Sequence, residues 1–259
     1  MPFRPEWIAA NALALWALVL LLALLAGDLA WRRCARLRAD ADTEGRYAPW
    51  MRRRTGIALV LSLLSLFGGL AYAVGVGEPG QLAAFDGALA EQLRTHMSNA
   101  ALRAIALLTQ LGGTPWVASA SVLVLLLLRR AWRLAAVWAF AQAGILPLVS
   151  AIKATILRPR PLHDHGFVTE AGWSFPSGHA LGSVVFYGML AYVLLRTLPA
   201  RWHRAVVAGA VALVVAIGIS RILLQVHYFS DVMAGYAGGL LWLLLCIGIA
   251  ERWHPRAAA

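Results

Sequence analysis

Residues 205–225 of the chain read AVVAGAVALVVAIGISRILLQ, and this stretch decides the fold class. Its first fifteen residues are all uncharged, and an α-helix needs about 20 predominantly apolar residues to cross a bilayer core. Six further runs of this kind lie at 7–31, 56–77, 112–129, 134–153, 178–196 and 232–250. We therefore predict an all-α, polytopic membrane helix bundle with seven spanning helices.

The composition supports this class. The chain has 259 residues, of which 61% are hydrophobic and 14% charged, whereas a soluble domain is about half apolar and about a quarter charged. The run at 7–31 is too long, and too weakly basic in front, for a cleaved signal peptide, so we interpret it as a membrane anchor. Cys34 and Cys246 have neither disulfide nor metal-ligand spacing, and we expect both to be inert.

The arginines predict the orientation in the membrane. Sixteen of the 22 fall on one side of seven crossing helices, in 31–54, 129–133, 196–204 and the tail after Glu251. Short loops rich in arginine face the cytoplasm, so the N-terminus is expected outside and the C-terminus inside. The net charge of +11 then indicates anchoring to membrane lipids. Nucleic-acid binding is set aside because the sequence has no recognition helix or basic strand with interleaved aromatic residues.

Few cations remain on the outer side, and one of them is the only lysine of the chain. It opens the stretch Lys153–Pro161, KATILRPRP, at the outer end of the fourth apolar run. Pro159 and Pro161 end the helix and hold the chain extended, so that a stiff turn presents Arg160. Taken alone, this stretch is typical of two cations at a membrane interface.

A second outer patch, Phe175–His179 (FPSGH), opens the fifth apolar run. Ser177 suits an N-cap, Gly178 lets a ligand approach the backbone, and the free N–H groups of a first helical turn attract anions. His179 projects from the same turn. In isolation, an ordinary capped helix start with an interfacial histidine explains this patch equally well.

The third outer patch runs from Ser220 to Asp231, SRILLQVHYFSD. Arg221 lies near the end of an uncharged run, where a charge is unfavourable without a partner or a function. His227 and Asp231 are four residues apart, so the carboxylate can accept a hydrogen bond from one ring nitrogen while the other acts as a nucleophile or base. Such a pair is more often structural when it stands alone, but here three patches share one side.

Together the patches hold the groups that phosphoryl transfer requires. Cations and backbone N–H groups can balance the charge on the equatorial oxygens, one histidine can attack in line, and another can protonate the leaving oxygen. The sequence offers no cluster of Asp and Glu that could form a metal cage. We therefore expect neither a metal ion nor another cofactor.

These patches resemble the signature of the type 2 phosphatidic acid phosphatase family, which is Lys-x6-Arg-Pro, Pro-Ser-Gly-His and Ser-Arg-x5-His-x3-Asp. The sequence matches it at Lys153, Arg160, Pro161, Pro176, Ser177, Gly178, His179, Ser220, Arg221, His227 and Asp231. The resemblance covers about 56–250. It implies a core of six spanning helices, to which the 7–31 helix is an addition.

The resemblance also implies a role for each site residue. His227 attacks phosphorus and forms a phosphohistidine, Asp231 orients it, and His179 protonates the leaving oxygen. The phosphate is bound by Lys153, Arg160, Ser177, Gly178 and Arg221. Arg158 matches no signature position, and we consider it a candidate headgroup contact only.

The expected organisation has three parts. They are an N-terminal transmembrane helix with an arginine-rich cytoplasmic loop at 1–55, the membrane phosphatase domain at 56–250 and a cytoplasmic tail at 251–259. Within the domain, 81–97 is expected to be an amphipathic helix on the outer membrane surface. Thr114 is expected to cap a helix with Pro115 in its first turn, and Gly235 and Gly239 to let another helix pack closely.

We therefore predict a metal-independent lipid phosphate phosphatase of a bacterial inner membrane, with its active site at the periplasmic face. Undecaprenyl diphosphate, phosphatidylglycerophosphate, phosphatidate and a lipid A phosphate all remain open as substrates, as does the oligomeric state. The alternative is a lipid-to-lipid phosphotransferase that uses the same phosphoenzyme. A non-catalytic transporter or scaffold is less well supported, because His179, His227 and Asp231 are intact and the sequence has no broken-helix repeats.

Overall fold

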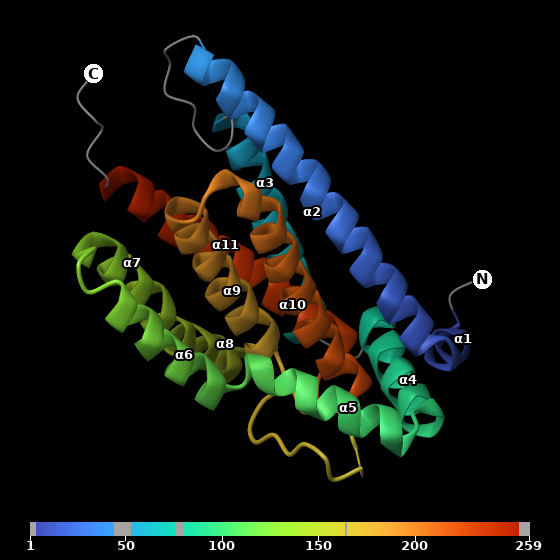
Figure 1. Ribbon diagram of the computed structural model, residues 1–259. Coiled ribbons are helices and arrows are strands. Elements are labelled where there is room, and N and C mark those ends of the chain that lie inside the picture. Colours follow the sequence, from blue (N-terminus) through green and yellow to red (C-terminus); the bar gives the residue numbers. More distant parts are fainter. Residues whose placement is uncertain (1–3, 44–52, 76–79, 164, 254–259) are drawn as a thin grey trace.

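The computed structural model describes residues 4–43, 53–75, 80–163 and 165–253, and every regular element in these ranges is a helix (Figure 1). The α-helices are α1 (Pro5–Ala10), α2 (Ala12–Thr43), α3 (Arg53–Gly75), α4 (Gln81–His96), α5 (Asn99–Thr109), α6 (Thr114–Leu127), α7 (Trp132–Ala143), α8 (Ile145–Ile156), α9 (Gly178–Thr197), α10 (His203–Leu223) and α11 (Phe229–Trp253). Two 3-10 turns, η1 (Gln110–Gly112) and η2 (Ala200–Trp202), complete the order. The all-α prediction is confirmed.

Seven helical runs in the described ranges are long and apolar enough to cross a membrane, as predicted. They are Ala12–Arg36, Arg54–Gly75, Asn99–Leu127, Trp132–Ile156, Gly178–Thr197, Ala200–Leu223 and Phe229–Trp253. The third run differs most from the prediction of 112–129, because it begins at Asn99 and includes α5, which η1 joins to α6. Helix α6 has 14 residues, about 21 Å at 1.5 Å per residue, and α5 lies across the end of the bundle (Figure 1).

Two predicted helix starts are shifted in the structure. The first apolar run is interrupted at Asn11, whose side-chain Nδ2 donates to the carbonyl of Trp7 at 2.9 Å, so the spanning helix begins at Ala12. The prediction that Thr114 caps α6 was wrong by one residue. Gly113 is the N-cap, Thr114 is already helical, and the Thr114 side chain makes no capping hydrogen bond.

Helix α9 lies at the centre of the main core. Its side chains Leu181, Phe186 and Met189 are buried with Trp138 of α7 and Ile217 of α10. Helix α11 packs on α9 through glycines, as predicted. A Cβ on Gly235 would lie 2.8 Å from the carbonyl oxygen of Ser177, and one on Gly239 would lie 2.8 Å from that of Leu181. These two glycines therefore allow the backbones of α9 and α11 to approach closely.

A second, smaller core holds α4 and α5 at one end of the bundle. Leu93 of α4 and Ile105 of α5 pack there with Leu224 and Val226, which follow α10. The segment between α8 and α9 lies at the same end, whereas the α9–α10 turn lies at the opposite end (Figure 1). The arginines of that turn, Arg196, Arg201 and Arg204, are thus remote from the segments that carry the three signature patches.

Candidate active site

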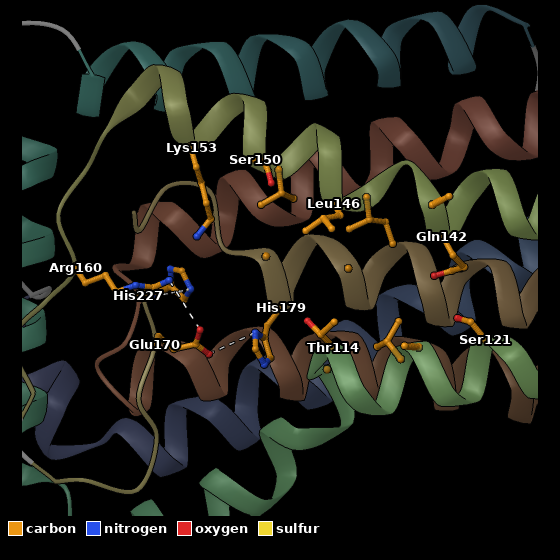
Figure 2. A pocket seen from close by; sticks show the side chains of 18 residues that line it. Thr114, Ser121, Gln142, Leu146, Ser150, Lys153, Arg160, Glu170, His179 and His227 are labelled. Carbon is orange, nitrogen blue, oxygen red and sulfur yellow. Dashed lines mark hydrogen bonds and ion pairs between the residues drawn. The ribbon is translucent and has the colours of Figure 1, made fainter. Parts of the chain in front are cut away.

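The three signature patches converge on one cavity of about 560 Å³. Lys153 comes from the last turn of α8, Arg160 from the segment after it, His179 from the first turn of α9 and His227 from the turn between α10 and α11. All four side chains line the cavity, and Figure 2 shows them gathered at one end. Segments up to about 70 residues apart in the sequence therefore form one polar site.

The start of α9 forms one wall of this site. Ser177 is the N-cap, as predicted, and its hydroxyl accepts a hydrogen bond from the N–H of Ala180 at 3.4 Å. Its own N–H donates to the carbonyl of Asp231 at 3.0 Å, which joins α9 to α11. Gly178 lines the cavity, so that the positive end of the helix dipole lies beside the cations.

His227 is almost completely buried and is held from two sides. On one side, Nε2 lies 3.1 Å from Nη1 of Arg160, which also donates to the carbonyl of Val226 at 2.8 Å. On the other side, Nδ1 lies 3.6 Å from Oδ2 of Asp231 and 3.3 Å from the hydroxyl of Ser174. Because Nδ1 faces the carboxylate, Nε2 is the nitrogen that is available for attack.

The contact between His227 and Asp231 is less direct than the sequence spacing predicted. A separation of 3.6 Å is longer than a hydrogen bond, because His227 precedes α11 and is not on its first turn. The hydroxyl of Ser174 lies beside both groups and donates to Oδ2 of Asp231 at 2.5 Å. Ser174 therefore bridges the pair, a role that the sequence did not suggest.

The surroundings keep His227 neutral. Burial lowers the pKa of His227 to about 4, and the cations Arg160 and Arg221 lower it as well, against the opposing effect of Asp231. A neutral imidazole has a free lone pair at pH 7 and can attack an electrophile. His227 therefore carries an unprotonated ring nitrogen, Nε2, which lies against Arg160.

Asp231 is fully buried and fully hydrogen-bonded. Besides Ser174, the N–H of Tyr228 donates to Oδ2 at 2.8 Å, and Nη1 of Arg158 donates to Oδ1 at 2.6 Å. The interpretation of Arg158 as a headgroup contact was wrong, since its side chain is buried against the protein. Although burial acts to lower the pKa of Arg158, Asp231 and Asp86 raise it overall, so this residue is a permanent cation.

Arg221 reaches the cavity indirectly. It is fully buried, and its Nη1 donates to the hydroxyl of Thr109 at 2.9 Å. Its Nη2 donates to the carboxylate of Glu170, which lines the cavity. Glu170 also lies 3.9 Å from Arg160 and 3.8 Å from Nδ1 of His179. An acidic side chain therefore occupies the centre of the cation cluster.

Lys153 closes the cluster from α8. Its Nζ donates to the carbonyl of Trp173 at 2.5 Å, and the side chain lines the cavity beside Arg160 and His227 (Figure 2). Among the described residues, no group of three or more His, Cys, Asp or Glu side chains is placed to hold a metal ion. Lys153, Arg160 and a helix N-terminus supply positive charge at the cavity, and Arg221 lies behind Glu170.

Beyond its polar end, the cavity continues between α6, α8 and α9. Its walls there are mainly apolar and include Val117, Ala118, Ile145, Leu146 and Val149. Ser121 and Gln142 lie at the end away from His227 (Figure 2). The cavity thus has a charged head and an apolar body, the division that is found in an amphiphile.

Known proteins share this sequence pattern. Phosphatidylglycerophosphatase B of Bacillus subtilis is 39% identical over 106 residues, which are 39% of this chain and 50% of that protein. Lipid A 1-phosphatase of Rhizobium johnstonii is 34% identical over 107 residues, 38% of this chain and 40% of that protein. The chain thus spans half or less of the length of these curated relatives.

The fold has a solved counterpart. The crystal structure of a transmembrane PAP2 type phosphatidylglycerolphosphate phosphatase from Bacillus subtilis matches this chain with a TM-score of 0.69 and 26% identity. The match covers 76% of this chain and 98% of that structure. The sequence of residues 130–255 itself matches the PAP2 superfamily. By sequence, by fold and by its signature residues, this protein belongs to the PAP2 superfamily.

Proposed function

We propose that the protein is a membrane-embedded lipid phosphate phosphatase that acts through a phosphohistidine at His227. The observation that carries this proposal is the cavity, in which His227 lies at a cationic end and an apolar body extends between helices. A lipid phosphate has the same division into a charged head and apolar chains. The names of the relatives, phosphatidylglycerophosphatase B and lipid A 1-phosphatase, support this substrate class.

In the first half-reaction, Nε2 of His227 attacks phosphorus. A P–N bond forms while the P–O bond to the lipid breaks, and His179 gives a proton to the leaving oxygen. A bound phosphate dianion favours the protonated form of His179, because opposite charges stabilise each other. Lys153, Arg160 and Arg221 then balance the charge on the equatorial oxygens.

In the second half-reaction, water replaces the histidine. His179 now takes a proton from the water molecule, whose oxygen attacks phosphorus as the P–N bond breaks. Inorganic phosphate leaves and His227 returns to its neutral form. Asp231, which Ser174 bridges to Nδ1, stays beside the ring throughout and stabilises the positive charge that the ring carries in the phosphohistidine.

The reaction as proposed needs no metal ion and takes place at the outer face. The cations around the cavity supply the charge that Mg²⁺ supplies in other phosphoryl-transfer enzymes. The arginine-rich end of the bundle, with Arg196, Arg201 and Arg204, is remote from the site. By the positive-inside rule, this arrangement supports a cavity at the periplasmic side of a bacterial inner membrane.

The test is phosphate release by the purified protein from undecaprenyl diphosphate, phosphatidylglycerophosphate, phosphatidate and a lipid A phosphate. At least one of them should be hydrolysed, activity should persist in EDTA, and vanadate should inhibit. Activity that is lost in EDTA and returns only with Mg²⁺ would contradict the metal-free charge balance. Transfer of phosphate to a second lipid, without release, would identify a phosphotransferase instead.

Two variants separate the histidine roles. His227→Ala should abolish turnover and prevent labelling of the enzyme by a substrate with a radioactive phosphate. His179→Ala should slow the reaction of a lipid alkoxide strongly, and that of an activated aryl ester less, because a good leaving group needs little protonation. Substantial turnover by His227→Ala would remove the nucleophile assignment.

A further inference from the structure

A buried carboxylate from outside the matched sequence region reaches the start of α11. Asp86 lies on α4, whereas the superfamily match begins at residue 130. Its side chain has no exposed surface. Oδ1 accepts a hydrogen bond from the N–H of Ser230 at 3.2 Å, and Oδ2 accepts one from the hydroxyl of Ser230. Asp231 follows Ser230 directly in α11, so these two hydrogen bonds fix Asp86 beside Asp231.

Arg158 connects the two carboxylates. Its Nη2 donates to Oδ2 of Asp86 at 2.8 Å, and its Nη1 donates to Oδ1 of Asp231 at 2.6 Å. The guanidinium also lies 4.1 Å from the centre of the Tyr228 ring. Because a guanidinium is planar, a bond on each arm fixes the direction of both. Ser174 and the N–H of Tyr228 hold Oδ2 of Asp231, and the hydrogen bond to Oδ1 depends on what holds the other arm of Arg158.

We propose that Asp86 is a positioning residue for catalysis, which acts on His227 through Arg158 and Asp231. The inference rests on the proposed function, because it assigns Asp86 a part in the chemistry of His227. Neither Asp86 nor Arg158 lines the cavity, so the role is exerted through the carboxylate behind the nucleophile and not through contact with the lipid.

The charges explain why a second carboxylate is needed. When His227 attacks phosphorus, positive charge develops on its ring, and Asp231 has to stabilise it. Arg158 paired with Asp231 alone would form a neutral unit, whose effect on the ring is weak. With Asp86, the three groups carry a net charge of −1, and this charge persists because burial limits screening by water. Asp86 therefore offsets Arg158 and leaves Asp231 effective as an anion.

The plainer explanation is that Asp86 only caps α11 and ties α4 to the bundle. It predicts a loss of stability, in which Asp86 and Arg158 are coupled through their ion pair, but no coupling between them in kcat of the folded protein. The positioning role predicts coupling between them, because removing Asp86 is harmful only while Arg158 still neutralises Asp231. A double-mutant cycle measures this coupling.

The experiment compares Asp86→Asn, Arg158→Gln and the double variant, with kcat and KM measured for the lipid phosphate that the wild-type protein hydrolyses. Asparagine has the same size and removes the charge, and its one amide oxygen can still accept a hydrogen bond from Ser230, while the amide N–H₂ replaces the second acceptor. We expect kcat of Asp86→Asn to fall on the order of tenfold, an effect typical of removing a residue that hydrogen-bonds to and orients a functional side chain. KM should stay unchanged. The double variant should lose no more than the worse single variant.

Glu91→Gln is the matched control. It removes a carboxylate from the same helix, where Glu91 is largely exposed and pairs with Arg94, so kcat should stay at the wild-type value. Thermal unfolding in detergent measures the folded fraction by which kcat is normalised. If Asp86→Asn fails to fold, Arg158→Lys serves instead, since one ammonium cannot bridge both carboxylates, and kcat should fall with KM unchanged.

Two results would overturn the inference. One is a normal kcat for Asp86→Asn, or for Arg158→Lys where that variant replaces it. The other is a double variant whose losses multiply. The proposed function is judged separately, by phosphate release from the wild-type and Glu91→Gln proteins and its absence from His227→Ala. If those hold and Asp86→Asn is fully active, the positioning role alone is wrong.

Discussion

Glu170 and Arg221 form a hydrogen-bonded ion pair at the centre of the cation cluster. The carboxylate also lies within 4 Å of Arg160 and His179, at 3.9 and 3.8 Å. In the proposed function, Arg160 and Arg221 bind the substrate phosphate, and His179 protonates the leaving oxygen. A phosphate that binds Arg221 has to replace the Glu170 carboxylate, so the two anions compete for the same site.

This competition predicts that Glu170→Gln binds phosphate analogues more tightly. Glutamine is similar in size and carries no charge, so an incoming anion no longer displaces another anion from Arg221. We expect the inhibition constant of vanadate to fall about tenfold, ~1.4 kcal/mol, within the range of hydrogen bonds to charged groups. Glu91→Gln, on the exposed face of α4, should leave it unchanged. Equal or weaker inhibition of Glu170→Gln would contradict the competition.

A second prediction concerns the acid side of the pH profile. The pKa of His227 is lowered from 6.5 to about 4, so the ring to which we assign the attack stays unprotonated in the free protein until the pH approaches this value. The profile of kcat/KM, which reports the free enzyme, should therefore lose activity as the pH falls through about 4. A loss centred near 6.5 would show that His227 titrates as an ordinary histidine.

The same shift affects stability, and the measurement has to account for it. The unfolded chain binds a proton at His227 below about pH 6.5, whereas the folded protein does so only near 4. The contribution of His227 to the free energy of unfolding is therefore complete above 6.5 and is lost as the pH falls through about 4. Rates should be normalised to the folded fraction at each pH.

The sequence predicted the spanning helices and the signature residues for clear physical reasons. Length and apolar composition determine which segments can cross a bilayer, since every backbone group must be satisfied within the helix. Counting how often the predicted helices cross the membrane assigned the three patches to the same side of it. The structure brings Lys153, Arg160, His179 and His227 to one cavity.

The supporting residues could not be predicted in the same way. Glu170 and Ser174 lie in the irregular segment before α9, where the direction of a side chain depends on tertiary packing. Asp86 left a signal, because it lies four residues after Leu82 and three before Leu89, on the apolar face of the amphipathic helix. A carboxylate on that face requires a buried partner. The partner proved to be Arg158, which no signature position includes.

Lys153 gives a third prediction, which concerns why a single lysine stands among 22 arginines. Its ammonium donates to the carbonyl of Trp173 at 2.5 Å and faces the cavity. A planar guanidinium is longer and cannot place one compact charge at this point. Lys153→Arg should lower kcat/KM at least about tenfold, ~1.4 kcal/mol, and Lys153→Gln should lower it further because the charge is lost. Near-wild-type activity of Lys153→Arg would make the lone lysine incidental.

The fourth prediction is the orientation of the site. Single cysteines serve as markers once Cys34 and Cys246 are replaced. Leu162, in the segment between α8 and α9, is 87% exposed. Ala200 is exposed in the turn between α9 and α10, at the opposite end of the bundle.

An impermeant maleimide added to intact spheroplasts should label Leu162→Cys and not Ala200→Cys, and permeabilised cells should show labelling of both. The reason is the distribution of charge, since the arginine-rich turns stay on the cytoplasmic side and the cationic cavity lies at the other end. Neither position lines the cavity, so both variants should retain phosphatase activity, which verifies the fold. Labelling of Ala200→Cys alone in intact spheroplasts would place the cavity in the cytoplasm, and lipids of the inner leaflet would then be its substrates.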